Sequence, residues 1–293
     1  MKFSESHPVV NLVFYICALV MGMCFWHPAF LICALFFSFA YYGIVKKALV
    51  GYLLGMTGLF FAVALINPFF NIYGETVLFT FWKGRPYTLE AVYYGFALAS
   101  MFISVLTWFA TYQEVMTEDK FLYCFGRLAP SVSLIFTMVL RLVPNFMRKA
   151  KQIAGARKCI GKSVESGMVS EKINHGMVIV SVMTSWTLEG GVITADSMKS
   201  RGFGCGKRTS FSIYQMKKKD WCLLGIMAVL AMIIFVCAWQ GGMKISYIPT
   251  VEMAVIRQPW TMLGVFCYGA LLSIPTVLYI MEEMTWYILK SKI

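Results

Sequence analysis

Charged residues are scarce in this sequence of 293 residues. Asp, Glu, Lys and Arg together make up 14% of it, whereas hydrophobic residues make up 59%. A soluble domain carries about 25% charged residues. The shortage therefore excludes an ordinary soluble fold and, with the long apolar runs, is typical of a polytopic membrane protein. Acidic residues are the scarcer kind, 14 against 26 basic ones, so the formal charge is +12.

The sequence also lacks the residue clusters that carry common chemistry. Its nine cysteines are scattered, with no CxxC pair and no Cys/His cluster, which argues against a disulfide framework or a zinc site. The three histidines, His7, His27 and His175, all lie outside the apolar segments, so none is placed to hold a metal at membrane depth. We expect no catalytic activity in this chain, no bound metal or cofactor, and no nucleic-acid partner.

Two short patterns resemble known chemical motifs but lack their context. Residues 156–163 fit a relaxed phosphate-loop pattern, yet they begin inside a predicted amphipathic helix and follow no strand. A helix end followed by a loop is the better interpretation. The pair Glu282 and Glu283 resembles the paired glutamates of intramembrane proteases, but without histidines at membrane depth we interpret it as interfacial.

Six apolar segments are long enough, or nearly so, to cross about 30 Å of hydrocarbon. They are residues 9–25, 29–45, 50–66, 89–109, 221–239 and 262–280. A seventh apolar run, 128–143, is closed by Arg141 and Pro144 and could be a partial or tilted crossing. The predicted fold is all-α, a polytopic membrane protein with about six transmembrane helices. We divide it into N-terminal transmembrane helices (1–127), a cytoplasmic coupling-helix region (128–220) and C-terminal transmembrane helices (221–293).

The basic residues predict the orientation, because cytoplasmic loops are enriched in Lys and Arg. With six crossings and a cytoplasmic N-terminus, all but four of the 26 basic residues lie inside. The four outside are Lys83, Arg85, Lys244 and Arg257. We therefore expect both termini in the cytoplasm. A full crossing by residues 128–143 would reverse the orientation of everything downstream.

An arginine lies on the apolar face of the first predicted coupling helix. Phe146, Ala150, Ile153 and Arg157 recur at intervals of four, three and four residues, which is one face of an α-helix. A guanidinium on a buried stripe needs a carboxylate or carbonyl oxygens, and no acidic residue is close in sequence. Its partner must come from elsewhere in the fold or from another chain. The alternative is that Arg157 extends to a lipid headgroup.

A second arginine is predicted at the end of a later helix. Ile193, Ser197 and Arg201 again recur every four residues, and Gly202 is placed to end the helix in a left-handed conformation. A cation at a helix C-terminus is favoured by the macrodipole by roughly 0.3–1 kcal/mol. Two arginine-tipped helices predict two equivalent sockets on a soluble dimer, recognised through Arg–carboxylate anchors.

Several runs resemble the transmembrane T component of energy-coupling factor (ECF) transporters, the vitamin and metal importers of prokaryotes. The most specific of them extends from Leu188-Glu189 through Ala195 to Gly204; the others are residues 66–70, 89–95 and 141–144. The resemblance implies short Ala-Arg-Gly-like motifs that couple to two ATP-binding-cassette ATPases. Carried over, the first motif is Ala156-Arg157-Lys158 and the second Ser200-Arg201-Gly202, with lysine and serine departing from the usual residues.

The resemblance implies a non-enzymatic subunit in the cell membrane of a prokaryote. It would link two ATPases, which bind the ATP, to a small substrate-binding membrane subunit for uptake of a vitamin or metal ion. A stand-alone permease that binds its own substrate is the alternative, and a membrane enzyme is a third class. The transported solute, and whether the two ATPases are identical, are not encoded in any pattern of this sequence.

Overall fold

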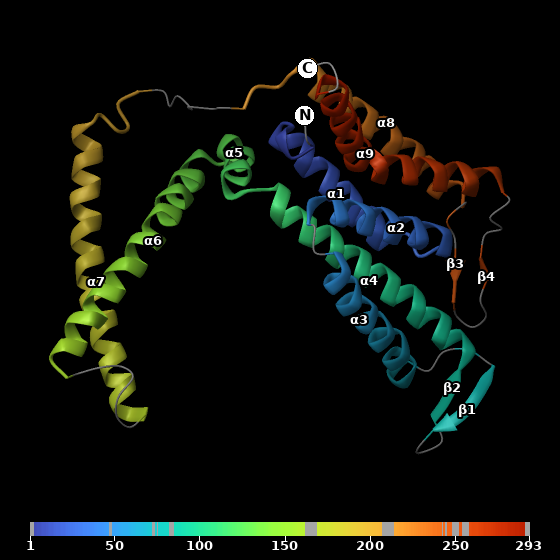
Figure 1. The fold of residues 1–293 in the computed structure, drawn as a ribbon, viewed down its shortest axis with the longest axis horizontal. Helices are drawn as coiled ribbons and strands as arrows, with labels where there is room; N and C mark the ends of the chain where they lie inside the picture. Colours follow the sequence, from blue (N-terminus) through green and yellow to red (C-terminus); the bar gives the residue numbers. More distant parts are fainter. Residues whose placement is uncertain are drawn as a thin grey trace. The chain divides into compact units, whose positions relative to one another are not determined.

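The computed structural model separates the chain into two compact units, shown in Figure 1. The first unit is Met1–Phe121 together with Tyr214–Ile293, and the second is Leu122–Ile213. The structure describes residues 3–46, 49–71, 74, 76–81, 85–161, 169–206, 214–241, 243, 245–247, 252–253 and 258–290. The predicted coupling region, 128–220, overlaps the second unit; its functional role stays a prediction.

Helices dominate both units. The first unit contains the 3-10 turn η1 (Phe3–Glu5) and the helices α1 (Pro8–Cys24), α2 (Pro28–Val45), α3 (Leu49–Phe70), α4 (Leu89–Val115), α8 (Lys218–Trp239) and α9 (Pro259–Lys290). Two small antiparallel hairpins join β1 (Val77–Phe81) to β2 (Arg85–Thr88) and β3 (Ile245–Ser246) to β4 (Glu252–Met253). The division between the units falls inside α5 (Glu118–Leu128), and α6 (Pro130–Cys159) and α7 (Val169–Ser200) form the second unit. The all-α fold class is confirmed.

Two His-Pro pairs start α1 and α2 by the same local mechanism. The Nδ1 atoms of His7 and His27 accept hydrogen bonds from the backbone N–H groups of Val9 and Ala29, both at 3.3 Å. Each following proline occupies the first helical position, where its missing N–H costs nothing. Two of the three histidines are therefore helix caps, which gives them a structural role.

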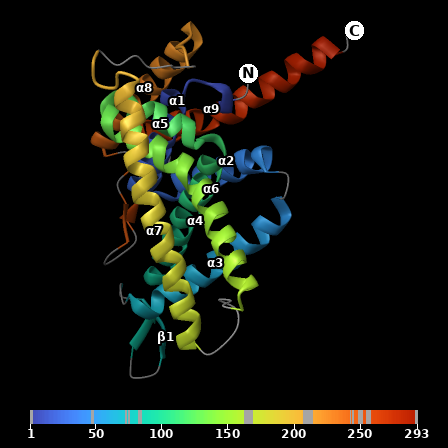
Figure 2. The ribbon, with the colours of Figure 1, turned by 90° about the vertical axis from the view of Figure 1, so that its left-hand side faces the viewer.

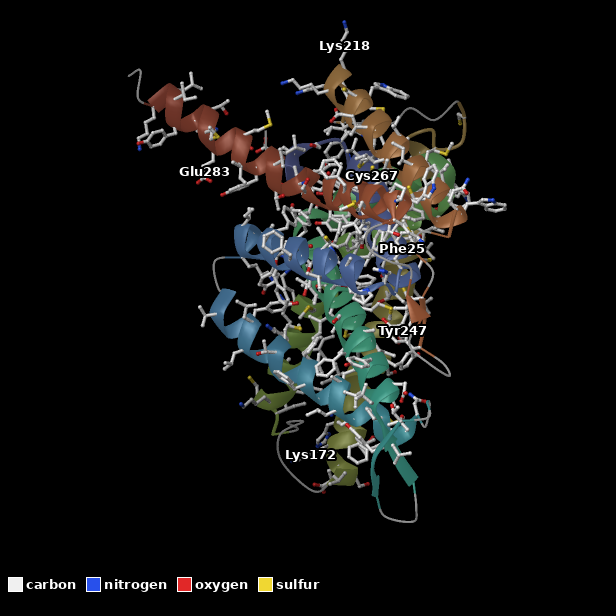
Figure 3. All side chains as sticks on the ribbon, turned by 90° about the vertical axis from the view of Figure 1, so that its right-hand side faces the viewer. Phe25, Lys172, Lys218, Tyr247, Cys267 and Glu283 are labelled. Carbon is white, nitrogen blue, oxygen red and sulfur yellow. The ribbon has the colours of Figure 1, made fainter. Side chains whose placement is uncertain are left out.

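The core of the first unit is built from aromatic side chains around α4. Trp108 is fully buried, with ring centroids 5.4 Å from Phe14, 6.2 Å from Tyr15 and 6.0 Å from Tyr41. α4 packs against α1, α2 and α3, while α9 packs against α2 and α8. In Figure 3, Cys267 lies among the crowded side chains of the unit, whereas Glu283 lies on the far stretch of α9.

Polar contacts tie several helix ends together at what we call the His7 end of the first unit. The backbone N–H of His7 donates to Oδ1 of Asp220 at 3.4 Å, joining the starts of α1 and α8. Lys46 and Glu114 form an ion pair at 2.7 Å, joining the ends of α2 and α4. The Nζ of Lys120 donates to the carbonyl of Ser4 in η1, which links α5 to the same group.

Aromatic contacts define the opposite, Trp26 end. The indole of Trp26 stacks on Tyr94 at the start of α4, with ring centroids 5.4 Å apart. The hydroxyl of Tyr247, which follows β3, donates to the carbonyl of Trp26 at 2.9 Å. The end of α1, the start of α4 and the chain after α8 therefore meet there. At the end of α3, Phe69 contacts Tyr87 of β2.

These contacts show that α1, α2, α3, α4, α8 and α9 run alternately between the two ends. They coincide with the six predicted transmembrane segments. The chain leaves the His7 end after α4 and returns to the same end at α8, so residues 121–214 cross the membrane twice or not at all. α6 and α7 therefore cross together or not at all, and whether residues 128–143 cross the membrane stays a prediction.

Length and composition alone mark seven helices as candidate spans among the described residues, including α6 and α7. α1, with 17 residues, is apolar but shorter than the 18 residues of the shortest candidate, and it is not among the seven. Neither α6 nor α7 has any residue buried within its unit. Pro144 was expected to close an apolar segment, but α6 continues through it to Cys159.

Two of the family-like runs pack on each other where α3 meets α4. A Cβ atom added at Gly95 would lie 2.6 Å from the backbone oxygen of Ala64 and 3.4 Å from Cβ of Asn67. Such a distance is far below van der Waals contact, so glycine allows the two helix backbones to approach closely. In the same run, the carboxylate of Glu90 accepts hydrogen bonds from the backbone and hydroxyl of Thr76, which anchors the loop before β1.

We expect Gly95→Ala to destabilise the first unit by about 1–3 kcal/mol, because the added methyl group must push α3 away from α4. The thermal unfolding midpoint of the detergent-solubilised protein measures this. Gly58→Ala on α3 is the matched control, since nothing lies within 4 Å of a Cβ atom there. Equal midpoints for both variants would contradict the close approach.

Single cysteines in a cysteine-free variant test the alternation of the helices. Cysteines replacing Glu5 and Lys217 belong to the His7 end and should react with a membrane-impermeant maleimide from the same side. A cysteine replacing Gln258, at the start of α9, should react from the opposite side. Labelling of positions 5 and 217 from different sides would contradict the derived topology.

Candidate functional site

α6 and α7 of the second unit form a long antiparallel helical hairpin. Figures 1 and 2 show the two rods lying beside each other over part of their length. Trp186 of α7 contacts Phe146 of α6, with ring centroids 5.8 Å apart. The Nζ of Lys149 lies 5.4 Å from the centre of the same indole, within the range of a cation–π interaction.

The helical stripe predicted for residues 146–157 is the face of α6 that packs on α7. Phe146, Ala150, Ile153 and Arg157 are all half-buried, whereas Arg148 and Lys151 are exposed. Lys149, next to this face, is also half-buried and lies beside Trp186. The spacing in the sequence thus identified the packed face correctly, with Lys149 at its margin.

Arg157, the centre of the first predicted motif, binds a histidine. Its Nη2 lies 3.0 Å from Nδ1 of His175, which is on α7. The Nε of Arg157 is shielded from solvent and has no hydrogen-bond partner among the described residues. Its flanking residues, Ala156 and Lys158, are exposed. The sequence analysis expected a carboxylate or carbonyls and did not identify His175.

Arg201, the centre of the second motif, sits at the very end of α7. The chain reverses at Gly202, which has a left-handed φ of 77°. The N–H of Gly202 donates to the carbonyl of Lys199 at 2.9 Å, and the N–H of Phe203 donates to the carbonyl of Met198 at 3.0 Å. This pair of bonds is a Schellman motif, and it confirms the expected helix stop.

Arg201 is exposed, and it follows the last residue of α7 at the negative end of the dipole of that helix. Ser200 beside it is also exposed, and its hydroxyl donates to the carbonyl of Asp196 at 2.9 Å, within its own helix. The residues of the second motif therefore make their described contacts within α7 and its C-terminal turn. They leave the arginine accessible for a partner.

The two motifs occupy different positions relative to their helix ends. Gly161 ends α6 with a φ of 73°, as Gly202 ends α7. Arg157, however, precedes its glycine by four residues, whereas Arg201 precedes its glycine directly. Arg157 therefore lies in the last turn of α6, two residues before its end, whereas Arg201 follows the last residue of α7. The reason is that the first motif carries lysine where the second carries the helix-ending glycine. The prediction of two equivalent sockets on a partner stays a prediction.

The two arginines are far apart along α7. Arg157 is bound at His175 near the start of that helix, and Arg201 follows its last residue. The 26 residues between positions 175 and 201 rise by roughly 39 Å at 1.5 Å each. The two guanidinium groups therefore lie near opposite ends of α7. This separation is large enough for each of them to occupy a separate binding site.

The other chemical candidates gain no support from the structure. Glu283 is exposed and Glu282 is half-buried on α9, and no group of three or more His, Cys, Asp or Glu among the described residues is arranged to hold a metal. Of the phosphate-loop pattern, residues 156–159 are helical, whereas Lys162 and Ser163 lie outside the described residues. A cradle around a phosphate is therefore not supported.

Comparison with known proteins points to membrane transport. The family model described as CbiQ, cobalt transport protein, matches residues 4–213. A stretch of 105 residues is 29% identical to the energy-coupling factor transporter transmembrane protein EcfT of Listeria innocua, covering 36% of this chain and 40% of that protein. The protein of the same name from Staphylococcus aureus is 25% identical over 111 residues, 38% of this chain and 41% of its own length. The chain thus matches about two fifths of the length of these curated relatives.

We expect Gly202→Ala to fray the last turn of α7, because a side chain at φ 77° is strained by about 1 kcal/mol. Hydrogen exchange at the amides of Gly202 and Phe203 should accelerate, since both lie in the Schellman bonds. Gly191→Ala, inside α7 with open space around it, is the control and should leave exchange at these amides unchanged. Unaltered protection in Gly202→Ala would contradict the motif.

Proposed function

This chain belongs to the CbiQ family of cobalt transport proteins, and we propose that it is the transmembrane coupling subunit of an ATP-driven importer of the energy-coupling factor type. In this role it transmits movement and catalyses no reaction. Two ATP-binding-cassette ATPases bind and hydrolyse the nucleotide, and a separate small membrane protein binds the cargo. The names of the curated relatives support this assignment.

The observation that carries the proposal is the presentation of two arginines by one helical hairpin. α7 runs between them over roughly 39 Å, and the contacts at Trp186 and His175 hold α6 against it. A guanidinium offers planar, paired donors that suit a carboxylate in a groove. Each arginine is proposed to anchor one ATPase subunit through such a pair.

The hairpin can transmit movement because a helix is stiff along its axis. Closure of an ATPase dimer around nucleotide displaces its two grooves relative to each other. An arginine anchored in each groove makes α6 and α7 follow that displacement. The membrane-spanning helices would receive the movement through the connections at α5 and before α8, both of which start from the His7 end.

The His7 end of the first unit is proposed to face the cytoplasm. Lys46, Lys120 and the run Lys217–Lys219 are at this end, and cytoplasmic surfaces are enriched in such residues. Burial lowers the pKa of the Lys120 ammonium, which nevertheless keeps two carbonyl acceptors, of Ser4 and Val115. The segment 121–214, which leaves and returns at this end, then meets cytoplasmic ATPases without having to cross the membrane.

A stand-alone permease gains less support. The first unit has a cavity of about 470 Å³ between α2, α3 and α4. It is lined by Pro28, Leu31, Ile32, Phe60, Tyr93, Phe96, Ala97, Ser100 and Tyr247, without a charged side chain. A site for a metal ion or a charged vitamin needs polar groups that converge on it. The cargo, a vitamin or a metal ion, is therefore proposed to bind a separate subunit.

We expect Arg157→Ala and Arg201→Ala each to weaken association with the ATPases, and the double variant to abolish it together with transport. Truncating one partner of a buried, hydrogen-bonded charge pair costs about 2–5 kcal/mol of binding. Co-purification of the full-length chain with co-expressed ATP-binding-cassette ATPases from the source genome measures the loss. Arg148→Ala, an exposed arginine of α6, is the matched control.

Intact co-purification and transport in the double Arg157/Arg201 variant would overturn the coupling role. Equal losses in the Arg148 control and in the two motif variants would show that general positive charge, and not the two motifs, attracts the partner.

A further inference from the structure

We propose that His175 is a positioning residue for Arg157: in its neutral form it holds the guanidinium in the orientation that a partner carboxylate recognises. The proposal rests on the coupling role given above and extends it to a residue outside both motifs. The observation behind it is the 3.0 Å contact between Arg157 Nη2 and His175 Nδ1.

The chemistry of the contact determines the state of the histidine. A guanidinium only donates hydrogen bonds and stays charged throughout the pH range of proteins. Nδ1 of His175 must therefore be the acceptor, which requires its lone pair. The imidazole of the bonded pair is neutral and carries its proton on Nε2.

The same contact orients the arginine. A guanidinium is planar, so a bond at Nη2 restricts the direction of its other donors. One N–H of Nη2 is used at His175, and the guanidinium carries four further N–H donors. Nε is shielded from solvent and has no partner among the described residues. The side chain as a whole is half-buried, so part of it lies at the surface, where a carboxylate from a partner can accept from it without displacing His175.

Arg201, the second proposed anchor, has no such positioning side chain among the described contacts. Arg201 is exposed after the last turn of α7, and the hydrogen bonds described around it are backbone bonds of the Schellman turn. The two ATPase contacts would then differ in chemistry as well as in position.

A double-mutant cycle tests the positioning role on the full-length chain with its co-expressed ATPases. His175→Ala is expected to weaken association about tenfold, the size of a lost hydrogen bond to a charged group. His175→Asn, whose Oδ1 can replace Nδ1 as acceptor, should restore it. In the Arg157→Ala background, His175→Ala should have no further effect, because His175 acts through Arg157.

Each other outcome has a definite meaning. If Arg157→Ala binds normally, the coupling role itself is wrong. If Arg157→Ala weakens association but His175→Ala does not, only the positioning role is wrong. Tighter association of His175→Ala would show that the histidine competes with the partner, and an equal loss in both backgrounds would show a purely structural role.

Histidine labelling gives a second readout that does not depend on His175→Ala folding. With three histidines in the chain, ¹⁵N labelling of histidine should show an Nδ1 of His175 that carries no proton and accepts a hydrogen bond. A proton on Nδ1 overturns the proposal.

Discussion

Backbone polar groups cannot remain unpaired in hydrocarbon, and this constraint organises the first unit. A segment that crosses the membrane must satisfy its N–H and C=O groups internally, so the chain crosses as complete helices and turns only at their ends. The polar contacts accordingly gather at these ends. His7 and Asp220 join two helix starts, and Lys46 and Glu114 join two helix ends. Because these ends are paired, the number of crossings made by the intervening segment must be even.

The second unit is under a different constraint, since no residue of α6 or α7 is buried within it. Contacts between the two helices include a tryptophan against a phenylalanine and a lysine, and an arginine against a histidine. Such a hairpin leaves most of its surface for lipid and for other proteins. A subunit that transmits movement between partners needs this exposure, which agrees with membership of a transport family.

The two arginines illustrate how similar motifs acquire different surroundings. Gly202 ends α7 directly after Arg201 and leaves the guanidinium exposed at the helix terminus. Lys158 at the corresponding place lets α6 continue to Cys159, so Arg157 remains on the face that packs against α7. A difference of one residue type therefore moves one arginine inward by about a turn. The proposed ATPase contacts are correspondingly unequal, which favours two distinct sockets over two identical ones.

The sequence by itself determined the features that depend on local periodicity and composition. These are the apolar helices of the first unit, the packed stripe from Phe146 to Arg157, the helix stop at Gly202 and the resemblance to a transport family, which the comparisons confirmed. Only the tertiary structure decided that α6 continues through Pro144, that residues 121–214 return to the end they left, and that His175 binds Arg157. The last two depend on which residues of distant segments come within a few ångströms, because a contact between two helices is set by their register and crossing. No spacing along one helix contains that information.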